Sequence, residues 1–445
     1  MEIEISEGAR RIIKVLKLKG YNAYVVGGAV RDCLMGRAPH DFDIATSATP
    51  QEVKKTFPKT INTGIKHGTV TVIDMNGCFE VTTFRSDGEY SDSRHPENVS
   101  FINDVREDML RRDFTINALA YNDSDGLIDC VGGRSDIENK IIRCVGEPER
   151  RFKEDALRML RAIRFSVVLG FSIEKETAAA IKKYAVLIKR VSAERIREEI
   201  EKILRSENPG GIIKLHELGM LQYIIPELEV CFSVAQKNKY HIYNVGDHII
   251  HAVSATPEDI VIRWAALLHD IGKPLCQSVD ANGTIHFYGH HHESVRLADD
   301  ILHRLKLDNE SRKNILLLIE NHDIRIEANS VSVKRVMARL GEELFSKLLI
   351  LQEADNYAKN HKFLEDKLNK LNDVRVIYRK ILSERQPYMI SDLVINGRDL
   401  IKIGFRVGRE IGDTLHALLD EVLINPKLNN REYLMMRARQ LKKKK

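Results

Sequence analysis

The stretch VVGGAVRDCLMGRAPHDFDIATSA, residues 25–48, decides how the first part of the chain folds. Its two opening valines predict a strand, and the glycine pair after them allows the backbone to approach a large anionic group. Arg31 follows within one helical turn of Gly28. The stretch therefore predicts a strand, a tight turn and a short helix that together form a phosphate cradle.

Two carboxylates one residue apart follow in the run DFDIA. This alternating run predicts a second strand, in which residues i and i+2 point to the same face. Asp41 and Asp43 would then converge on a shared Mg²⁺, which takes carboxylate oxygens and leaves positions for water and phosphate. A glycine pair or an Asp-x-Asp alone is a common surface feature, but the two in this order and spacing indicate phosphoryl or nucleotidyl transfer. The dinucleotide-binding pattern G-x-G-x-x-G is absent from this stretch.

The composition favours several domains. With 445 residues the chain is too long for one ordinary domain, and 43% hydrophobic residues are enough for a core in each of three or four. The β-branched runs lie in the first 150 residues, and helical spacing dominates from Phe152 onward. We therefore expect an α+β head with a small mixed sheet, followed by a long helical remainder.

Charge and cysteine content narrow the class of protein further. The net charge of +5 is modest, so a polyanionic partner would be bound by local basic patches rather than by the whole surface. The six cysteines form no C-x-x-C pair, which predicts reduced thiols and a cytoplasmic protein. No run of about 18 apolar residues occurs, so we expect no membrane span.

Further polar residues of the head are candidates for the same site. Glu80, on the predicted strand Phe79–Phe84, could be a further metal ligand or a base for an attacking hydroxyl, or a salt-bridged surface residue. Arg112 lies in a segment, Arg111–Asp113, that we expect to open a helix, and arginine binds phosphate oxygens in a bidentate way. The polar segment Arg85–Val105 predicts a mobile loop.

The segment FKEDALRMLRAIRF, Phe152–Phe165, predicts a helix with one polar side. Asp155, Arg158 and Arg161 are three residues apart and would line that side. An aspartate that accepts and an arginine that donates hydrogen bonds can together read the Watson–Crick edge of a base. The alternative is an intrahelical surface salt bridge, which contributes little stability.

These motifs resemble the class II tRNA nucleotidyltransferases, the CCA-adding enzymes, and the related bacterial poly(A) polymerases. The resemblance runs nearly continuously from Tyr24 to about Leu204. It rests on the motifs GGAVRD with DFD, TGIKHGTVTV, EVTTFR, DGEYSDSRHPENVSF, RRDFTINALA, DCVGGRSDI, EDALRMLRAIRF and ERIREEIEKIL.

The resemblance assigns roles in the head. It implies that Gly28 and Arg31 contact the triphosphate of the incoming CTP or ATP, and that Arg112 touches the nucleotide. Asp41 and Asp43 would hold catalytic Mg²⁺. The 3′-hydroxyl of an RNA would attack the α-phosphorus and pyrophosphate would leave, with two metals stabilising the attacking and leaving oxygens.

The resemblance also assigns base selection to the helix after the head. Asp155 and Arg158 would pair with the incoming base, and Arg161 and Arg164 would assist with base or phosphate. The 85–105 segment resembles the flexible element that such enzymes use to switch from C to A addition, which argues against an enzyme that adds only C.

The second half of the chain carries a separate set of histidines and aspartates. The motif HDIGK after an apolar helix, with histidines on both sides and a distal aspartate, resembles the HD phosphohydrolase superfamily. The resemblance implies a metal site in the HD domain made of His248, His269, Asp270 and Asp355, with His291 and His322 as candidates for a second metal. Which of His290, His291 and His292 serves is open. Imidazoles with carboxylates suit transition metals, Mn²⁺, Ni²⁺, Fe²⁺ or Zn²⁺, which could support phosphoester hydrolysis. The alternative is a helical scaffold without activity.

The prediction is a CCA-adding tRNA nucleotidyltransferase with an inserted HD domain. The expected parts are an α+β head, then a helical neck, body, HD domain and tail, at residues 1–145, 146–205, 206–239, 240–370 and 371–445. The body and tail are expected to support the tRNA. Three alternatives remain: a poly(A) polymerase or A-adding enzyme, an HD phosphohydrolase with a regulatory nucleotide-binding head, and a non-catalytic tRNA-binding protein, which the intact Asp-x-Asp disfavours.

Overall fold

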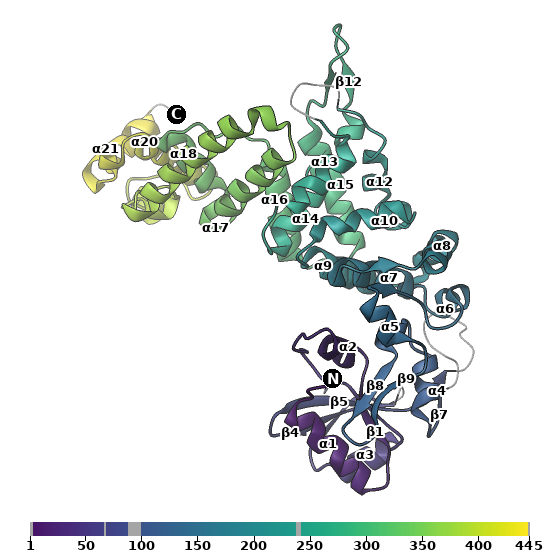
Figure 1. The fold of residues 1–445 in the computed structure, drawn as a ribbon. Helices are drawn as coiled ribbons and strands as arrows, with labels where there is room; N and C mark the ends of the chain where they lie inside the picture. The colour runs from purple at the N-terminus through teal and green to yellow at the C-terminus, as the bar shows by residue number, and fades with distance from the viewer. Residues whose placement is uncertain (1–2, 66–67, 88–98, 237–241, 444–445) are drawn as a thin grey trace. The chain divides into compact units, whose positions relative to one another are not determined.

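The computed structural model describes residues 3–65, 68–87, 99–236 and 242–443. The chain forms two compact units, Met1–Pro226 and Glu227–Lys445 (Figure 1). The first holds a sheet followed by helices and the second is almost entirely helical, which confirms the predicted α+β class. The five-part division stays a prediction, and the boundary between the two units falls within the predicted body.

A seven-stranded mixed sheet forms the head, in the order β3-β4-β5-β2-β1-β8-β9. Its strands are β1 (Ala23–Val26), β2 (Ile44–Thr46), β3 (Thr60–Gly64), β4 (Thr69–Asp74), β5 (Gly77–Thr83), β8 (Leu119–Asn122) and β9 (Gly126–Asp129). Only β2 and β5 are paired in parallel. This pairing places the start of β2 beside the middle of β5, so that Asp43, just before β2, lies next to Glu80 on β5.

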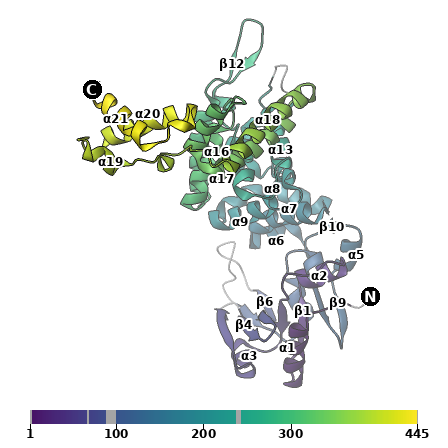
Figure 2. The ribbon, with the colours of Figure 1, turned by 90° about the vertical axis from the view of Figure 1, so that its left-hand side faces the viewer.

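Helices cover the sheet because each has one apolar side. Helix α1 (Glu7–Leu18) buries Ile12 and Leu16 against β1 and β2, and α3 (Pro50–Thr56) packs on β4 and β5. Figures 1 and 2 both show α1 and α3 side by side on one face. The remaining head elements are α2 (Gly28–Leu34), β6 (Arg85–Asp87), β7 (Val99–Phe101), α4 (Val105–Leu110), η2 (Thr115–Asn117), α5 (Gly133–Glu138) and β10 (Ile141–Ile142).

Short helices continue the first unit. They are α6 (Pro148–Glu154), α7 (Leu157–Leu169), α8 (Lys175–Tyr184), η3 (Ala185–Arg190), α9 (Ala193–Leu204), η4 (Pro209–Ile213), α10 (Lys214–Glu217) and α11 (Leu221–Ile224), with β11 (Ser172–Ile173) pairing to β10. Helix α7 packs against α9 and buries Leu160 and Ile163.

The second unit begins with a group of helices and one short hairpin. They are α12 (Pro226–Cys231), α13 (Val245–Ser254), α14 (Ile260–Leu268), η5 (Lys273–Leu275), α15 (His290–Arg304), α16 (Asn309–Asn321), α17 (Ser330–Tyr357), η6 (His361–Phe363) and α18 (Leu364–Ser383), with a hairpin of β12 (Ser278–Val279) and β13 (Ile285–His286). Helix α14 contacts α13, α16 and α17, and it buries Trp264, the single tryptophan of the chain.

The tail has a hydrophobic core of its own. Its elements are η7 (Ile390–Asp392), α19 (Gly397–Lys402), α20 (Arg409–Ile424), η8 (Pro426–Leu428) and α21 (Arg431–Lys443). Leu400, Leu418 and Leu434, one from each α-helix, are buried together. No helix of the described residues is long and apolar enough to cross a membrane.

Several local predictions were wrong. Asp41 and Asp43 precede β2 rather than lying in it, and Arg111 and Arg112 follow the end of α4 rather than opening a helix. The predicted helix 152–165 is broken at Asp155, whose backbone is extended with φ −144°. The flanks of the predicted loop pair as β6 and β7, and its centre, 88–98, lies outside the described residues.

Candidate functional site

Asp41, Asp43 and Glu80 lie close enough in the head for their charges to interact, where β2 and β5 run side by side. The backbone N–H of Val26 donates to the carbonyl of Asp43 at 2.9 Å, so β1 holds the segment just before β2. The register Ile44 with Val81 brings Glu80 next to Asp43. Loss of solvation, followed by the negative charges of Asp41 and Glu80, raises the pKa of Asp43 to about 6. Carboxylates that repel one another in this way are typical of a site for a hard cation.

The glycine turn brings two arginines to the start of α2. Gly27 has φ +73°, a conformation that other residues rarely adopt, and a Cβ there would lie 3.1 Å from a guanidinium nitrogen of Arg112. The Nε of Arg112 is buried and has no hydrogen-bond partner among the described residues. Arg31, on α2, is also buried. A donor without a partner, next to a turn free of side chains, can bind an anionic oxygen.

A chain of hydrogen bonds connects Arg31 to α7. Arg31 donates to the Oδ1 of Asn117 at 2.7 Å, and the Nδ2 of Asn117 donates to Asp113 at 3.4 Å. Asp113 also forms an ion pair with Arg161 of α7 at 2.7 Å. Burial would raise the pKa of Asp113, but the charges of Arg161 and Arg158 and the hydrogen bonds donated by Arg161 and by the backbone N–H of Phe114 lower it to about 2.

An aromatic ring gathers three of the predicted arginines. The Phe165 ring lies 5.3 Å from the guanidinium carbons of Arg31 and Arg161 and 3.8 Å from that of Arg164. Each cation is attracted to the face of the ring. Phe165 and Asp113 therefore align arginines from α2 and α7.

The structure does not pair Asp155 with Arg158. Asp155 forms an ion pair with Arg195 of α9 at 2.8 Å, and Arg158 pairs with Glu154 at 2.7 Å. Arg158 is only 9% exposed. The break between α6 and α7 turns the two side chains toward different partners.

The sequence analysis did not identify the residues that contact and position the predicted site residues. They are Asp113, Asn117, Glu154, Phe165 and Arg195, together with Glu199, which pairs with Arg164. Asp113 and Asn117 lie in RRDFTINALA and Phe165 ends the segment 152–165, so both motifs contained the signal. Their role was not visible because it depends on the approach of α7 to the head.

The depressed pKa of Asp113 predicts a pH dependence of stability. Its folded pKa, about 2, lies below the ordinary value of 3.8, so between these pH values the unfolded chain binds a proton that the folded chain does not. The stability contributed by this carboxylate is complete above about pH 4 and is lost as the pH falls to about 2. We expect the stability difference between wild type and Asp113→Asn, measured by calorimetry, to shrink by about 2 kcal/mol over that range. A difference that does not vary with pH would contradict this assignment.

The second cluster lies in the helical unit around Asp270. The Nε2 atoms of His248 and His269 each lie 3.2 Å from the Oδ2 of Asp270, and His248 Nε2 lies 3.1 Å from the Oδ1 of Asp355. Their Nδ1 atoms face the carbonyls of Ala358 and Ala266 at 3.1 and 2.8 Å. An Nδ1–H that donates to a carbonyl directs Nε2 toward a metal.

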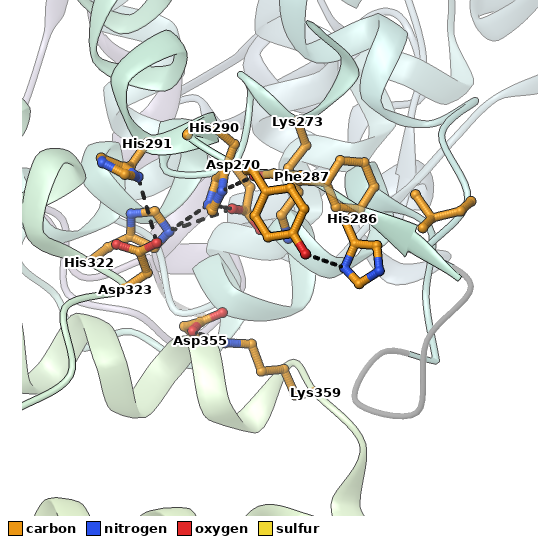
Figure 3. Close-up of a pocket in the computed structure, with 13 residues that line it drawn as sticks. Asp270, Lys273, His286, Phe287, His290, His291, His322, Asp323, Asp355 and Lys359 are labelled. Carbon is orange, nitrogen blue, oxygen red and sulfur yellow. Dashed lines mark hydrogen bonds and ion pairs between the residues drawn. The ribbon is translucent and has the colours of Figure 1, made fainter. Parts of the chain in front are cut away.

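The other oxygen of Asp270 faces two further histidines. His290 Nε2, from the start of α15, and His322 Nε2, from the end of α16, lie 3.2 and 3.6 Å from Oδ1 (Figure 3). Their Nδ1 atoms again face backbone carbonyls, at 2.9 and 2.7 Å. His290, rather than the predicted His291, thus stands against Asp270. His291 lies with Asp323, 3.7 Å away, at the edge of the cluster.

Two lysines and a histidine proton neutralise the buried carboxylates. Lys273 Nζ lies 2.6 Å from Asp270, and Lys359 pairs with Asp355. Burial works against ionisation, but these cations and the histidines hold the pKa values of both aspartates well below their usual range. Against its own burial, the same carboxylates raise the pKa of His269 to about 9. The cluster thus requires positive charge, which metal cations can supply.

A cavity of about 370 Å³ opens onto this cluster. In Figure 3, His290 and His322 point toward Asp270, and Asp355 of α17 faces them together with Lys359, which follows the end of that helix. The aromatic rings of Phe287 and Tyr288 line its other side. Among the described residues, all groups of three or more His, Cys, Asp or Glu with ligand atoms within 4.8 Å of one another are in this region. The donor set suits one or two transition-metal ions.

Gly272 allows the two halves of the cluster to approach each other. A Cβ at Gly272 would lie 2.5 Å from the carbonyl oxygen of His290 and from the backbone nitrogen of Ser294. We therefore expect Gly272→Ala to displace the start of α15 and to weaken the metal site of Asp270, His290 and His322, as metal analysis of the purified protein would show. Gly412→Ala is the matched control, because nothing lies within 4 Å of a Cβ there. Unchanged metal content in a variant with native Trp264 fluorescence would contradict this role.

Comparison with known proteins defines the class first. Residues 23–143 match the poly A polymerase head domain, residues 170–232 a probable RNA- and SrmB-binding site of polymerase A, and residues 239–360 the HD domain. The chain is therefore a nucleotidyltransferase that also carries an HD domain.

The relatives are more specific. The chain is 36% identical to the CCA-adding enzyme of Bacillus velezensis, over 95% of this chain and 94% of that protein, and 34% identical to that of Ligilactobacillus salivarius, over 97% and 95%. The crystal structure of the Bacillus stearothermophilus CCA-adding enzyme in complex with CTP is similar over 98% of both chains, with a TM-score of 0.69 and 31% identity. The chain belongs to the CCA-adding enzyme family.

Proposed function

We propose that this enzyme adds C, C and A to the 3′ ends of tRNA, with CTP and ATP as substrates. The observation that carries this proposal is the meeting of Asp41, Asp43 and Glu80 beside the arginines of the glycine turn. The family supports the substrates: solved structures are titled as CCA-adding enzymes with CTP, with ATP and with tRNA. Six free cysteines are consistent with work in the cytoplasm, which we also propose.

Asp41 and Asp43 would hold Mg²⁺, and Glu80 would be a further ligand or the base. Mg²⁺ bound there would supply stabilisation of the attacking and leaving oxygens. The 3′-oxygen of the RNA forms a bond to the α-phosphorus, the bond to the β-phosphate oxygen breaks, and pyrophosphate leaves. Arg31 and Arg112 bind the triphosphate. Because little covalent chemistry is left to the protein, positioning by Asn117 and Asp113 matters as much as charge.

Base selection would use Asp155 and Arg158 at the break between α6 and α7. Arg158 pairs with Glu154 and also donates to the carbonyls of Arg151 and Arg111 at 3.3 and 3.4 Å, and these longer bonds are the ones that it would exchange for bonds to a base. Arg161 and Arg164, aligned by Phe165, would support the base or the phosphates. A site with polar groups that only the correct base satisfies rejects the wrong one strongly.

Asp43→Asn should abolish nucleotide addition, because it removes a ligand charge from the Mg²⁺ site. The assay is incorporation into tRNA that lacks its 3′ terminus, with CTP alone, ATP alone or both. Wild type should add two C and then one A. Long A tracts would instead indicate a poly(A) polymerase, and A added only to a CC end would indicate an A-adding enzyme.

Arg158→Ala should reduce discrimination between CTP and ATP by about tenfold or more, more than it affects Mg²⁺ dependence. The matched control is Arg150→Ala on α6, since Arg150 also pairs with Glu154 but is largely exposed. Unchanged CTP/ATP discrimination in the Arg158 variant would remove this residue from base selection.

We also propose that the HD domain hydrolyses phosphoesters. The observation that favours this second activity is the arrangement of four Nε2 atoms around both oxygens of Asp270. His248, His269, His290 and His322 would hold Mn²⁺, Ni²⁺, Fe²⁺ or Zn²⁺ there, and the metal would supply the activation of a water molecule. The water oxygen forms a bond to phosphorus, the ester bond breaks, and the leaving alcohol takes a proton.

His269→Ala should abolish hydrolysis of 2′,3′-cyclic nucleotides with each of these metals and leave tRNA nucleotide addition within about twofold of wild type, because the two sites use different residues. Asp43→Asn is the reciprocal control, since it should remove addition and spare hydrolysis. If wild type hydrolyses no substrate with any of these metals, the domain is a scaffold.

A further inference from the structure

A second cavity, of about 580 Å³, adjoins the HD cluster. It shares His322, Asp323, Asp355 and Lys359 with the first cavity. Its far wall comes from α18, which contributes Lys367 and Lys370. The two cavities thus meet at the residues that would hold metal, and a molecule bound there can extend from one into the other.

Lysines give this cavity its charge. Lys359 lies at the border of the two cavities, and Lys367 and Lys370 are on the first two turns of α18. Burial, followed by the positive charge of Lys359, lowers the pKa of Lys367, although Asp355 acts in the opposite direction. Like charges brought this close together are stabilised by an anion between them.

The acidic residues of the same wall have partners of their own. Asp355 pairs with Lys359, Glu327 with Arg325 at 2.9 Å, and Asp323 lies 3.7 Å from His291. These contacts offset part of the negative charge, and four cationic residues line the cavity, Arg325, Lys359, Lys367 and Lys370, against the three carboxylates.

Helix α18 is held firmly in this position but lies outside the HD family match, which ends at residue 360. It packs along α17, buries Leu371 and Val374, and is tied to α17 by the ion pair of Arg375 with Glu353. Lys367 and Lys370 therefore come from the segment that follows the HD domain, not from the domain itself.

We propose that Lys367 and Lys370 bind a second, non-reacting phosphate of the molecule whose phosphoester lies at the HD cluster. This inference rests on the proposed HD activity and predicts that, among its substrates, the site prefers nucleotides with a second phosphate group, such as a nucleoside 3′,5′-bisphosphate. The reacting phosphate lies against Asp270 and its histidines, the nucleoside fills the shared space, and the second phosphate lies between α17 and α18. Neither lysine takes part in bond making or breaking.

The test compares adenosine 3′,5′-bisphosphate with adenosine 3′-monophosphate. Binding of each to the full chain with its metal retained is measured by calorimetry at a temperature low enough to make hydrolysis negligible, for wild type and for Lys367→Ala/Lys370→Ala. We expect the double variant to lose about tenfold in affinity for the bisphosphate and less than twofold for the monophosphate, because charged hydrogen bonds to one phosphate are removed. The loss should diminish as salt is raised.

Lys380→Ala is the matched control, since Lys380 is an exposed lysine of the same helix outside the cavity. Because the head also binds nucleotides, only the difference between variants is interpreted. Equal loss for both ligands, equal loss in the Lys380 variant, or no loss overturns the second-phosphate site. If binding depends on the lysines but neither nucleotide is hydrolysed with any metal, the phosphate site stands and the proposed HD activity fails. If the chain hydrolyses the monophosphate and shows no preference for the bisphosphate, the proposed HD activity stands and the second-phosphate site fails.

Discussion

The partly buried ion pair between Asp113 and Arg161 is the interaction on which the first site depends. It connects the loop after α4 to α7, and through Asn117 it fixes Arg31 beside the glycine turn. A buried carboxylate with a pKa of about 2 is held as an anion by its partners, so it serves as a permanent acceptor. Removing one member leaves a buried charge without compensation, which is far more costly than loss of a surface pair.

Asp270 has the corresponding role in the HD domain. One oxygen of Asp270 faces His248 and His269, and the other faces His290 and His322. A backbone carbonyl orients each imidazole through its Nδ1 atom. The orientation of the imidazoles therefore depends on backbone carbonyls rather than on flexible side chains. Gly272 contributes by letting the start of α15 approach.

The two sites differ in ligand chemistry. The head offers carboxylates only, which suit Mg²⁺ and its ligand water and phosphate. The HD cluster offers imidazoles around shared aspartates, which suit transition metals. One chain can therefore carry two phosphoryl chemistries that respond to different ions, and a substitution in one site is not expected to alter the other directly.

Residue type and spacing were sufficient to predict the α+β class and the family, because local motifs such as GGAVRD, DFD and HDIGK carry their chemistry in sequence order; the roles of the two groups of site residues stay predictions. The choice of His290 over its neighbour was not predictable from three consecutive histidines. It depends on the angle at which α15 begins, and that angle is set by contact with Gly272.

The break between α6 and α7 at Asp155 could not be predicted from the sequence either, because the helical periodicity continues across it. Only the packing of α6, α7 and α9 places Asp155 on Arg195 and Arg158 on Glu154. Sequence alone thus determined which groups are present and their chemical class. Tertiary structure decided which of them meet, since ion pairs and metal ligands need atoms within a few ångströms, and that proximity comes from segments far apart in the chain.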